Sequence, residues 1–204
     1  MTHMILVRHG QTEWNRVERF RGRADIPLNS TGLQQAELTG QRISAGWQPV
    51  TIYAGPLART RQTAEAIGRC CDVPVIVEDR LIDIDYGAWQ GLTPGEVQAR
   101  WPDESAAWYA TPHLARIPDG ETLDALRTRA MLAVHDLAAR HEGRTIVLVS
   151  HTVVNRIILL GVLTLGNDRF WRLRQDTCAV NVFDMDSGEG TLVSMNDTCH
   201  LRSL

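Results

Sequence analysis

Lysine is absent from this chain of 204 residues, so all 21 basic residues are arginine. The absence excludes P-loop nucleotide binding, Schiff-base chemistry and any aspartyl phosphatase mechanism that depends on a lysine. If the protein binds a phosphate group, that group must be held by arginine, histidine or backbone amides.

Long apolar runs, a surplus of positive charge and paired cysteines are also missing. No stretch approaches the roughly 18 uninterrupted apolar residues of a membrane span, and the net charge of -3 argues against nucleic-acid binding. The four cysteines form neither a CxxC pair nor a zinc-ligand spacing, so we expect reduced thiols. An apolar run already begins at Met4, which leaves little room for a signal peptide, and we expect a cytoplasmic protein.

Two apolar runs far apart in the sequence each end close to a histidine. Residues 4–7 precede His9, and residues 145–149 precede His151. Both runs are typical of buried strands. If the two strands belong to one parallel sheet, both histidines emerge at the same edge, where such sheets bind their ligands.

Arginines near these segments have two interpretations. Arg59 falls in the first turn of a helix predicted to start at Pro56, where the helix dipole and the free amides favour an anion. A surface role suits Arg61 and Arg69 better. Residues 10–29 show no periodicity and form either a solvated arginine-rich loop or an electropositive rim that attracts anionic substrates. The arginines of this segment are Arg16, Arg19, Arg21 and Arg23.

The remaining pattern predicts one α/β domain over residues 1–204, long enough to bury a single core. Two short helices are expected to form a lid insertion over residues 93–120. The predicted strands cover residues 4–7, 50–54, 73–77, 145–149, 179–185 and 191–195. The other predicted helices cover residues 31–46, a segment from 56, a long segment from 122 and residues 153–163.

The sequence Arg8-His9-Gly10-Gln11-Thr12, followed by Asn15, resembles the signature of the histidine phosphatase superfamily, the phosphoglycerate mutase-like group. Further segments similar to that family lie near residues 59, 83, 121 and 151, so the resemblance spans nearly the whole chain. It implies a three-layer α/β/α sandwich with a mostly parallel central sheet. It also implies a small phosphomonoester as substrate and no metal or other cofactor. Neither nucleic acid nor a membrane is expected as partner, and a homodimer is compatible with the sequence.

The resemblance implies a catalytic set of five residues: Arg8, His9, Arg59, Asp83 and His151. His9 would attack phosphorus, with its other ring nitrogen held by a backbone carbonyl. The two arginines would bind phosphate oxygens, and His151 would add a donor when protonated. Asp83 would protonate the leaving alkoxide and afterwards activate water.

Asp83 stands where family members commonly carry glutamate, which keeps the carboxylic acid and shortens its reach. Asp85 is a nearby competitor for the same role. The pair could instead be a metal site or cap the loop, but no further clustered carboxylates accompany it. The pattern at Asp184, Asp186 and Gly188 hints at a calcium loop, lacks the remaining ligands and is interpreted as a turn.

Further substrate contacts are expected from the loop and helix starts that flank the histidines. Asn15 would hold a phosphate oxygen or fix the loop, and the amides of Gly10 and Thr152 would cradle the phosphate. Arg21, where relatives often have glutamine, is a candidate extra contact.

Within the family, residues 82–87, residues 111–113 and the C-terminal residues 196–201 look most like bacterial metal-independent phosphoserine phosphatases. This nominates His113 and His200 as substrate contacts. The alternatives are an exposed loop histidine and a frayed tail. Tyr86 departs from that subgroup, which has histidine at this position.

The expected function is therefore metal-independent hydrolysis of a small phosphorylated metabolite of the phosphoserine, sugar phosphate or phosphoglycerate type. One alternative is a cofactor-dependent phosphoglycerate mutase, against which the short lid argues, because a mutase must keep water from its intermediate. Another is a non-catalytic regulatory member that binds anions or protein, against which retention of the five catalytic positions argues.

Overall fold

A six-stranded mixed sheet forms the centre of the molecule in the computed structural model, which describes residues 1–202 and 204. The strand order is β3-β2-β4-β1-β5-β6. The first four strands in that order run parallel to one another, and β5 runs antiparallel to both of its neighbours, β1 and β6. This arrangement confirms the predicted α/β class with a mostly parallel sheet. The strands are β1 (Thr2–Arg8), β2 (Ile52–Ala54), β3 (Val75–Val77), β4 (Thr145–Ser150), β5 (Val180–Asp186) and β6 (Glu189–Asp197).

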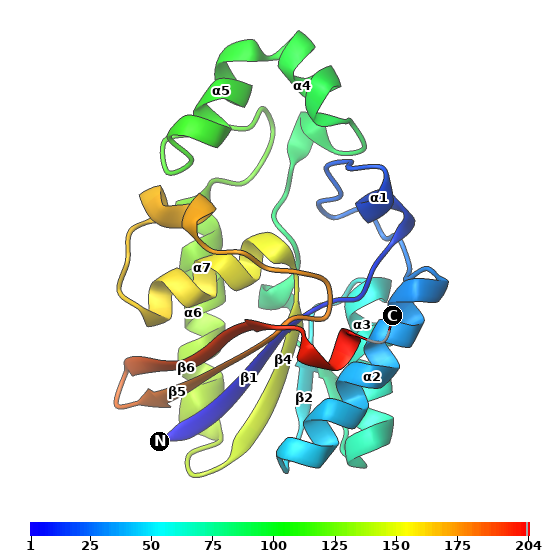
Figure 1. Ribbon diagram of the computed structural model, residues 1–204. Helices are drawn as coiled ribbons and strands as arrows, with labels where there is room; N and C mark the ends of the chain where they lie inside the picture. The colour runs from blue at the N-terminus through cyan, green and yellow to red at the C-terminus, as the bar shows by residue number, and fades with distance from the viewer. Residues whose placement is uncertain (203) are drawn as a thin grey trace.

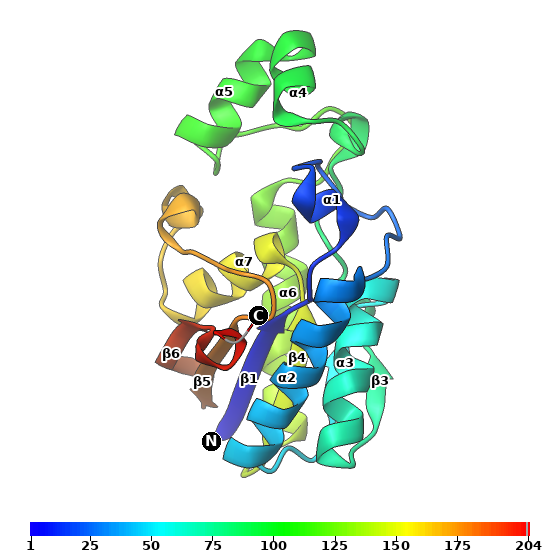
Figure 2. The ribbon, with the colours of Figure 1, turned by 45° about the vertical axis from the view of Figure 1, so that its right-hand side comes forward.

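Two helical layers cover the sheet (Figures 1 and 2). Successive residues of a strand point to opposite faces, so Ile5 and Val7 pack with α2 and α3, whereas Met4 and Leu6 pack with α6 and α7. Burial on both faces explains why β1 and β4 are continuously apolar. The helices are α2 (Ser30–Gly46), α3 (Ala58–Cys71), α6 (Leu123–Arg140) and α7 (Thr152–Val162). None of the helices in the described ranges is long and apolar enough to cross a membrane.

The two predicted lid helices are present as α4 (Pro94–Arg100) and α5 (Pro102–Ala110), drawn in green at the top of Figure 1. Thr93 and Glu96 form a capping box at the start of α4. Trp108 of α5 is buried against the rings of Phe170 and Trp171, which belong to the short helix η3 (Asn167–Arg172). These aromatic contacts fasten the lid to the body of the domain.

Short helical turns in the loops escaped the sequence prediction. Helix α1 (Glu13–Arg16) has four residues and is held by a capping box between Thr12 and Asn15. Such a short turn shows no apolar periodicity, because one turn cannot display a repeat of 3.6 residues. The remaining turns are the 3₁₀ helices η1 (Asp79–Leu81), η2 (Gly87–Trp89) and η4 (Cys199–Leu201).

Two glycines let the loop after β1 lie directly on the first turn of α2. A Cβ atom at Gly10 would lie 2.5 Å from the carbonyl oxygen of Gly32. A Cβ at Gly32 would in turn overlap the backbone of Gln11. The close approach of the two backbones fixes the loop that begins with His9.

The hairpin of β5 and β6 turns at Ser187 and Gly188, both with positive φ. Asp184 accepts a hydrogen bond from His3, and Asp186 lies 3.6 Å from the terminal amine of Met1. The part of the chain that the structure describes has no group of three or more His, Cys, Asp or Glu side chains placed to hold a metal ion.

Candidate active site

The neighbouring parallel strands β1 and β4 deliver two histidines to one edge of the sheet. Arg8 pairs with Ser150 in the β-ladder, so the next residues, His9 and His151, emerge side by side. Their ring centroids are 5.2 Å apart, in an edge-to-face arrangement, and both side chains are fully buried. The juxtaposition expected from the two apolar runs is therefore present.

The hydrogen bond of His9 determines which of its ring nitrogens can react. Nδ1 lies 2.7 Å from the carbonyl oxygen of Gly10. A carbonyl only accepts, so Nδ1 carries the proton and Nε2 keeps its lone pair. Burial, together with the charges of Arg59 and Arg8, holds the pKa of His9 well below its usual range. The ring is therefore neutral at neutral pH, with Nε2 available as a nucleophile.

His151 has the opposite tautomer. Its Nδ1 accepts a hydrogen bond of 3.3 Å from Nε of Arg59 and lies 3.5 Å from Oδ2 of Asp83. Because a guanidinium group cannot accept, the proton of the neutral ring sits on Nε2. Burial and the charge of Arg59 also lower the pKa of His151 well below its usual range. His151 thus presents an N–H donor without needing a positive charge.

Arg59, in the first turn of α3, connects His151 to the loop after η1 that carries Asp83, here called the acid loop. Its side chain is fully buried and donates to the carbonyl oxygens of Gly22 and Ala24, each at 2.7 Å. It also donates to Oδ2 of Asp83 at 3.1 Å. The arginine therefore keeps its charge in the interior because several acceptors surround it.

Asp83 and Asp85, four and six residues after η1 begins, lie in different environments. Asp83 is buried, and Oδ1 accepts from the amide of Ile84 at 3.0 Å. Burial raises the pKa of the Asp83 carboxyl, opposed by the charges of Arg59 and Arg21. The carboxylate of Asp85 accepts a hydrogen bond from the Gly87 amide and pairs with Arg23 at 3.2 Å on the partly exposed side of the loop. Of these two carboxylates, only that of Asp83 lies next to the histidine pair, through its contact with His151.

Two more guanidinium groups face the cluster. Arg8 donates from one terminal nitrogen to the carbonyl oxygen of Gln175 at 2.7 Å. Burial and the charges of Arg21 and Arg156 lower the pKa of Arg8 to about 9. The charge of Arg21 also contributes to lowering the pKa of His9 and of His151. The other arginines of the loop turn away, because Arg16 pairs with Glu13 on the surface and Arg19 donates to the carbonyl of Gly91.

Several polar atoms of the two histidines and of nearby residues have no hydrogen-bond partner. Within residues 1–202 and 204, five such buried side-chain atoms belong to the histidines, to Thr152 and to the arginines whose charges act on His9. They are Nε of Arg8, Nε2 of His9, Nε of Arg21, Nε2 of His151 and Oγ1 of Thr152. Three of these atoms are N–H donors, one is a hydroxyl, and one is the lone pair of His9. Buried donors of this kind are costly unless a ligand satisfies them, and their surplus favours an anion.

The two backbone amides expected to bind phosphate differ in whether they are free. Thr152 is the first residue of α7, so its amide has no acceptor within the helix. The Gly10 amide donates to Oγ1 of Thr63 at 3.1 Å, so the expectation that it cradles a phosphate is wrong for this geometry. Asn15 follows its second expected role, because its Oδ1 accepts from the amide and the hydroxyl of Thr12, each at 2.9 Å.

His200 does not reach the cluster. Its Nε2 lies 3.1 Å from Oγ1 of Thr39 in α2, so this ring docks the C-terminal segment on the helical layer. The segment does approach the site through other residues. A pocket of about 490 Å³ is lined by Arg8 and Asn15 together with Thr198, Leu201 and Arg202.

His113 lies in the loop that follows α5, with its Nδ1 buried and, among the described residues, without a hydrogen-bond partner. Its ring is half-buried and so is not the exposed loop histidine that was the alternative. Within the described ranges, no hydrogen bond, ion pair or ring contact joins it to His9 or His151, so its substrate role stays a prediction.

The sequence of the chain matches the model of the histidine phosphatase superfamily (branch 1) over residues 4–198. The chain belongs to this family. The two buried histidines, Arg8, Arg59 and Asp83 all lie within the matched residues. The protein is thus a phosphomonoesterase of the histidine phosphatase type.

Relatives of this histidine phosphatase cover almost all of its length. It is 36% identical over 201 residues to Phosphoserine phosphatase 1 of Hydrogenobacter thermophilus, with 98% of this chain and 95% of the relative covered. A metal-independent phosphoserine phosphatase of Arabidopsis thaliana is 31% identical, with 100% of this chain and 85% of the relative covered. The structure of Bacillus stearothermophilus YhfR superposes with a TM-score of 0.94 at 30% identity and covers 99% of this chain and 100% of YhfR.

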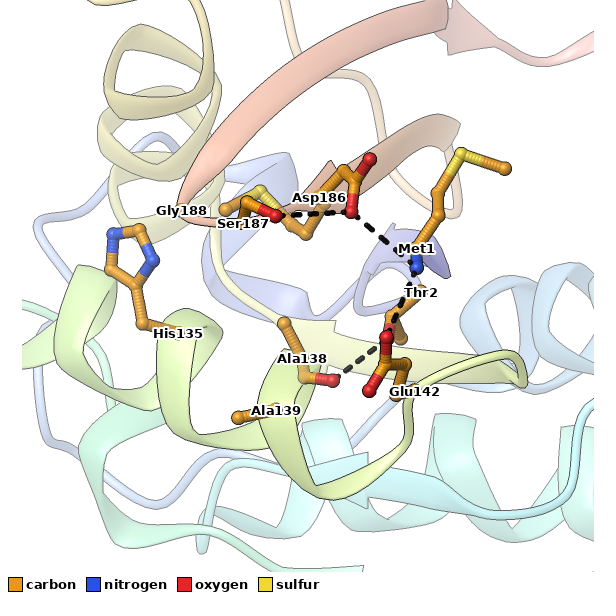
Figure 3. Close-up of a pocket in the computed structure, with 10 residues that line it drawn as sticks. Met1, Thr2, His135, Ala138, Ala139, Glu142, Asp186, Ser187 and Gly188 are labelled. Atoms are coloured by element: carbon orange, nitrogen blue, oxygen red, sulfur yellow. Dashed lines mark hydrogen bonds and ion pairs between the residues drawn. The ribbon is translucent and has the colours of Figure 1, made fainter.

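A second pocket lies at the other end of this histidine phosphatase (Figure 3). It has a volume of about 270 Å³ and is lined by Met1 and Thr2, at the start of β1, and by residues of α6 and the β5–β6 turn. The terminal amine of Met1 pairs there with Asp186 and Glu142. None of the five unpartnered atoms described above lines it, so we assign no part of the phosphatase chemistry to it.

Arg129 of α6 is a site residue that the sequence did not reveal. Its terminal nitrogens donate to the carbonyl oxygens of Ile82 at 2.8 Å and Asp83 at 3.1 Å. Glu121 accepts from the same guanidinium at 2.7 and 2.8 Å. Arg129 therefore holds the backbone of the acid loop against α6. Its helix position gives no signal, because the acceptors are main-chain atoms 46 and 47 residues away.

Replacing Arg129 by methionine should misplace the acid without removing it. We expect kcat/KM for ethyl phosphate to fall roughly 10- to 100-fold, because small displacements of catalytic groups have effects of this size. The value for p-nitrophenyl phosphate should stay within about threefold, since its leaving group needs no proton. Arg140→Met, at the exposed end of α6, is the matched control. Equal losses with both substrates would show a general structural defect instead.

Proposed function

We propose that this phosphatase is metal-independent and hydrolyses a small phosphorylated metabolite through a phosphohistidine at His9. The pair of His9 and His151, together with the buried and unpartnered donors of Arg8, Arg21 and His151, carries the proposal. Two curated relatives named phosphoserine phosphatase, one of them metal-independent, support it. Phosphoserine, sugar phosphates and phosphoglycerate are the substrate types that we consider.

The first half-reaction forms a bond between Nε2 of His9 and phosphorus. The bond from phosphorus to the ester oxygen breaks at the same time. The proton of His9 Nδ1 stays on the ring and keeps its hydrogen bond to the Gly10 carbonyl. This bond orients the ring and stabilises its new positive charge. Arg8, Arg21 and His151 donate to the three oxygens of the transferring group, whose charge must be stabilised in the transition state.

The ester oxygen leaves as an alcohol only if it receives a proton. We assign that proton to Asp83, because burial raises the pKa of its carboxyl and so favours the protonated form that a general acid needs. In the second half-reaction, water attacks phosphorus, its proton passes to the Asp83 carboxylate, and the bond to Nε2 of His9 breaks. Inorganic phosphate leaves, and both side chains return to their starting states.

The proposal is tested by measuring phosphate release from a panel of small phosphomonoesters in the presence of EDTA. The panel includes phosphoserine, 3-phosphoglycerate and several sugar phosphates. We expect hydrolysis that EDTA does not reduce, because arginine and histidine donors supply the charge that a metal would otherwise provide. Loss of activity in EDTA that added metal restores would contradict metal independence. Transfer of phosphate to a second hydroxyl in place of water would indicate a mutase.

The proposal also predicts a pH dependence. A carboxyl acid works in its protonated form, so kcat/KM for alkyl phosphates should fall as the pH rises through the raised pKa of Asp83. The lowered pKa of His9 keeps its lone pair available down to acidic pH. The falling limb should be missing with p-nitrophenyl phosphate, whose leaving group needs no proton. An identical limb with both substrates would assign it to another group.

A further inference from the structure

We propose that the pocket between the lid, η3 and the loop before Arg21 binds the alcohol part of the substrate and selects a ring-bearing alcohol. The inference rests on the proposed phosphatase function and names its substrate class. The pocket has a volume of about 130 Å³, and its walls include the rings of Phe20, Tyr86, Trp108 and Trp171.

Two residues of the pocket lining relate the pocket to the candidate active site. Arg21 lines the pocket and is also the arginine whose charge acts on His9 and His151. Tyr86 lines it as well, and the neighbouring charge of Asp83 contributes to raising the pKa of its hydroxyl. Tyr86 also lies against Gly22, because a Cβ there would be 3.3 Å from its ring, and the Gly22 carbonyl accepts from Arg59, the partner of Asp83. The pocket therefore lies next to the Arg59–Asp83 pair. A substrate whose phosphate sits against His9 would extend its leaving alcohol into this pocket.

The walls form one continuous set of aromatic contacts. The ring centroids of Phe20 and Tyr86 are 4.9 Å apart, and those of Tyr86 and Trp108 are 5.8 Å apart. Trp108 lies 5.8 Å from Trp171 in an edge-to-face arrangement. Each ring is fixed by its neighbours, so the pocket presents flat apolar surfaces. Such surfaces bind another ring through offset or edge-to-face contacts.

The volume of the pocket and the charges of its lining limit which group can bind in it. A cavity of about 150 Å³ holds benzene, so the pocket has room for about one six-membered ring. Among the charged residues of the lining, Arg19 is already engaged, because it donates to the Gly91 carbonyl and lies 3.7 Å from Glu96. The ammonium and carboxylate groups of phosphoserine would lose hydration against the aromatic walls. We therefore expect ring-bearing alcohols to be preferred over phosphoserine.

Benzyl phosphate and ethyl phosphate test the inference, because their leaving alcohols are primary alcohols of similar acidity and differ in the ring. We expect kcat/KM for benzyl phosphate to exceed that for ethyl phosphate roughly 10- to 100-fold, in line with the selectivity of apolar pockets. Benzyl phosphate should also exceed phosphoserine. Similar values for benzyl and ethyl phosphate, or a preference for phosphoserine, would overturn the inference and leave the proposed function intact.

Substitution of a pocket residue tests whether the ring of the substrate binds in this pocket. Tyr109 lines the outer wall, is 50% exposed and stacks on Trp171, so its replacement should not disturb the core. Tyr109→Ser should lower the ratio of benzyl to ethyl phosphate about threefold or more, whereas Tyr109→Phe should preserve it. Leu114→Ser, on the lid loop and outside the pocket, is the matched control and should leave the ratio unchanged. A ratio unchanged in Tyr109→Ser would overturn the assignment. Hydrolysis of neither ester by the wild type would overturn the proposed function itself.

Discussion

The His9→Ala variant is expected to lose at least about 10⁴-fold in kcat for every phosphomonoester, because the group that forms the covalent intermediate is gone. Donors from Arg8 and His151 remain, so substrate binding should be affected much less than turnover. His135→Ala is the matched control, since this histidine lies exposed on α6. Phosphate release measured at saturating substrate distinguishes the two variants. Thermal unfolding of both proteins checks that the buried His9 side chain is not required for folding.

Trapping of the intermediate gives an independent test of the same prediction. Rapid mixing with labelled substrate and an alkaline denaturing quench should leave label on the wild-type chain, because phosphohistidine survives alkali. The label should be absent from His9→Ala and present in His135→Ala. Label that persists in His9→Ala would place the nucleophile elsewhere. Turnover that survives in His9→Ala would contradict the mechanism as a whole.

The Asp83→Asn variant is expected to lower kcat/KM for ethyl phosphate about 10²- to 10⁴-fold, the usual contribution of general acid catalysis. An amide of the same shape still accepts from the Ile84 amide but cannot supply a proton. Asp85→Asn is the matched control, because Asp85 pairs with Arg23 and caps Gly87 away from the histidines. We expect kcat/KM for ethyl phosphate to fall less than about threefold in Asp85→Asn.

The leaving group separates loss of the acid from loss of structure. With p-nitrophenyl phosphate, Asp83→Asn should retain most of its kcat/KM, and its pH profile with alkyl phosphates should lose the falling limb at higher pH. Slower hydrolysis of the phosphoenzyme would appear in kcat, since the same carboxylate is assigned to activate water. Equal losses in the two variants, or a larger loss in Asp85→Asn, would assign the acid to Asp85 instead.

The pairing of His9 with His151 could be predicted from sequence, because it follows from strand pattern alone. Each histidine follows an apolar run, and parallel strands that are buried on both faces read as continuous apolar segments. The carboxyl ends of such strands meet at one edge, so the 141 positions between the histidines do not obscure their juxtaposition. Family motifs added the arginine of α3 and the acid loop, which periodicity alone does not identify.

The side-chain partners within the site could not be predicted in the same way. The sequence suggested that the Gly10 amide binds phosphate, but the hydroxyl of Thr63 accepts from it. It suggested that His200 reaches the substrate, but Thr39 holds that ring against α2. Each partner is set by how a helix packs on the sheet. Hydrogen bonds between residues so far apart in the chain leave no periodic signal.

The sequence by itself thus determined the fold class, the order of the elements and the residue types that can bind a phosphate. These features depend on apolar periodicity and on local motifs, which are written along the chain. Only the tertiary structure decided the tautomers of His9 and His151, the brace from Arg129 and the aromatic pocket beside Tyr86. Those features depend on distances between atoms brought together from separate elements, and packing alone fixes such distances.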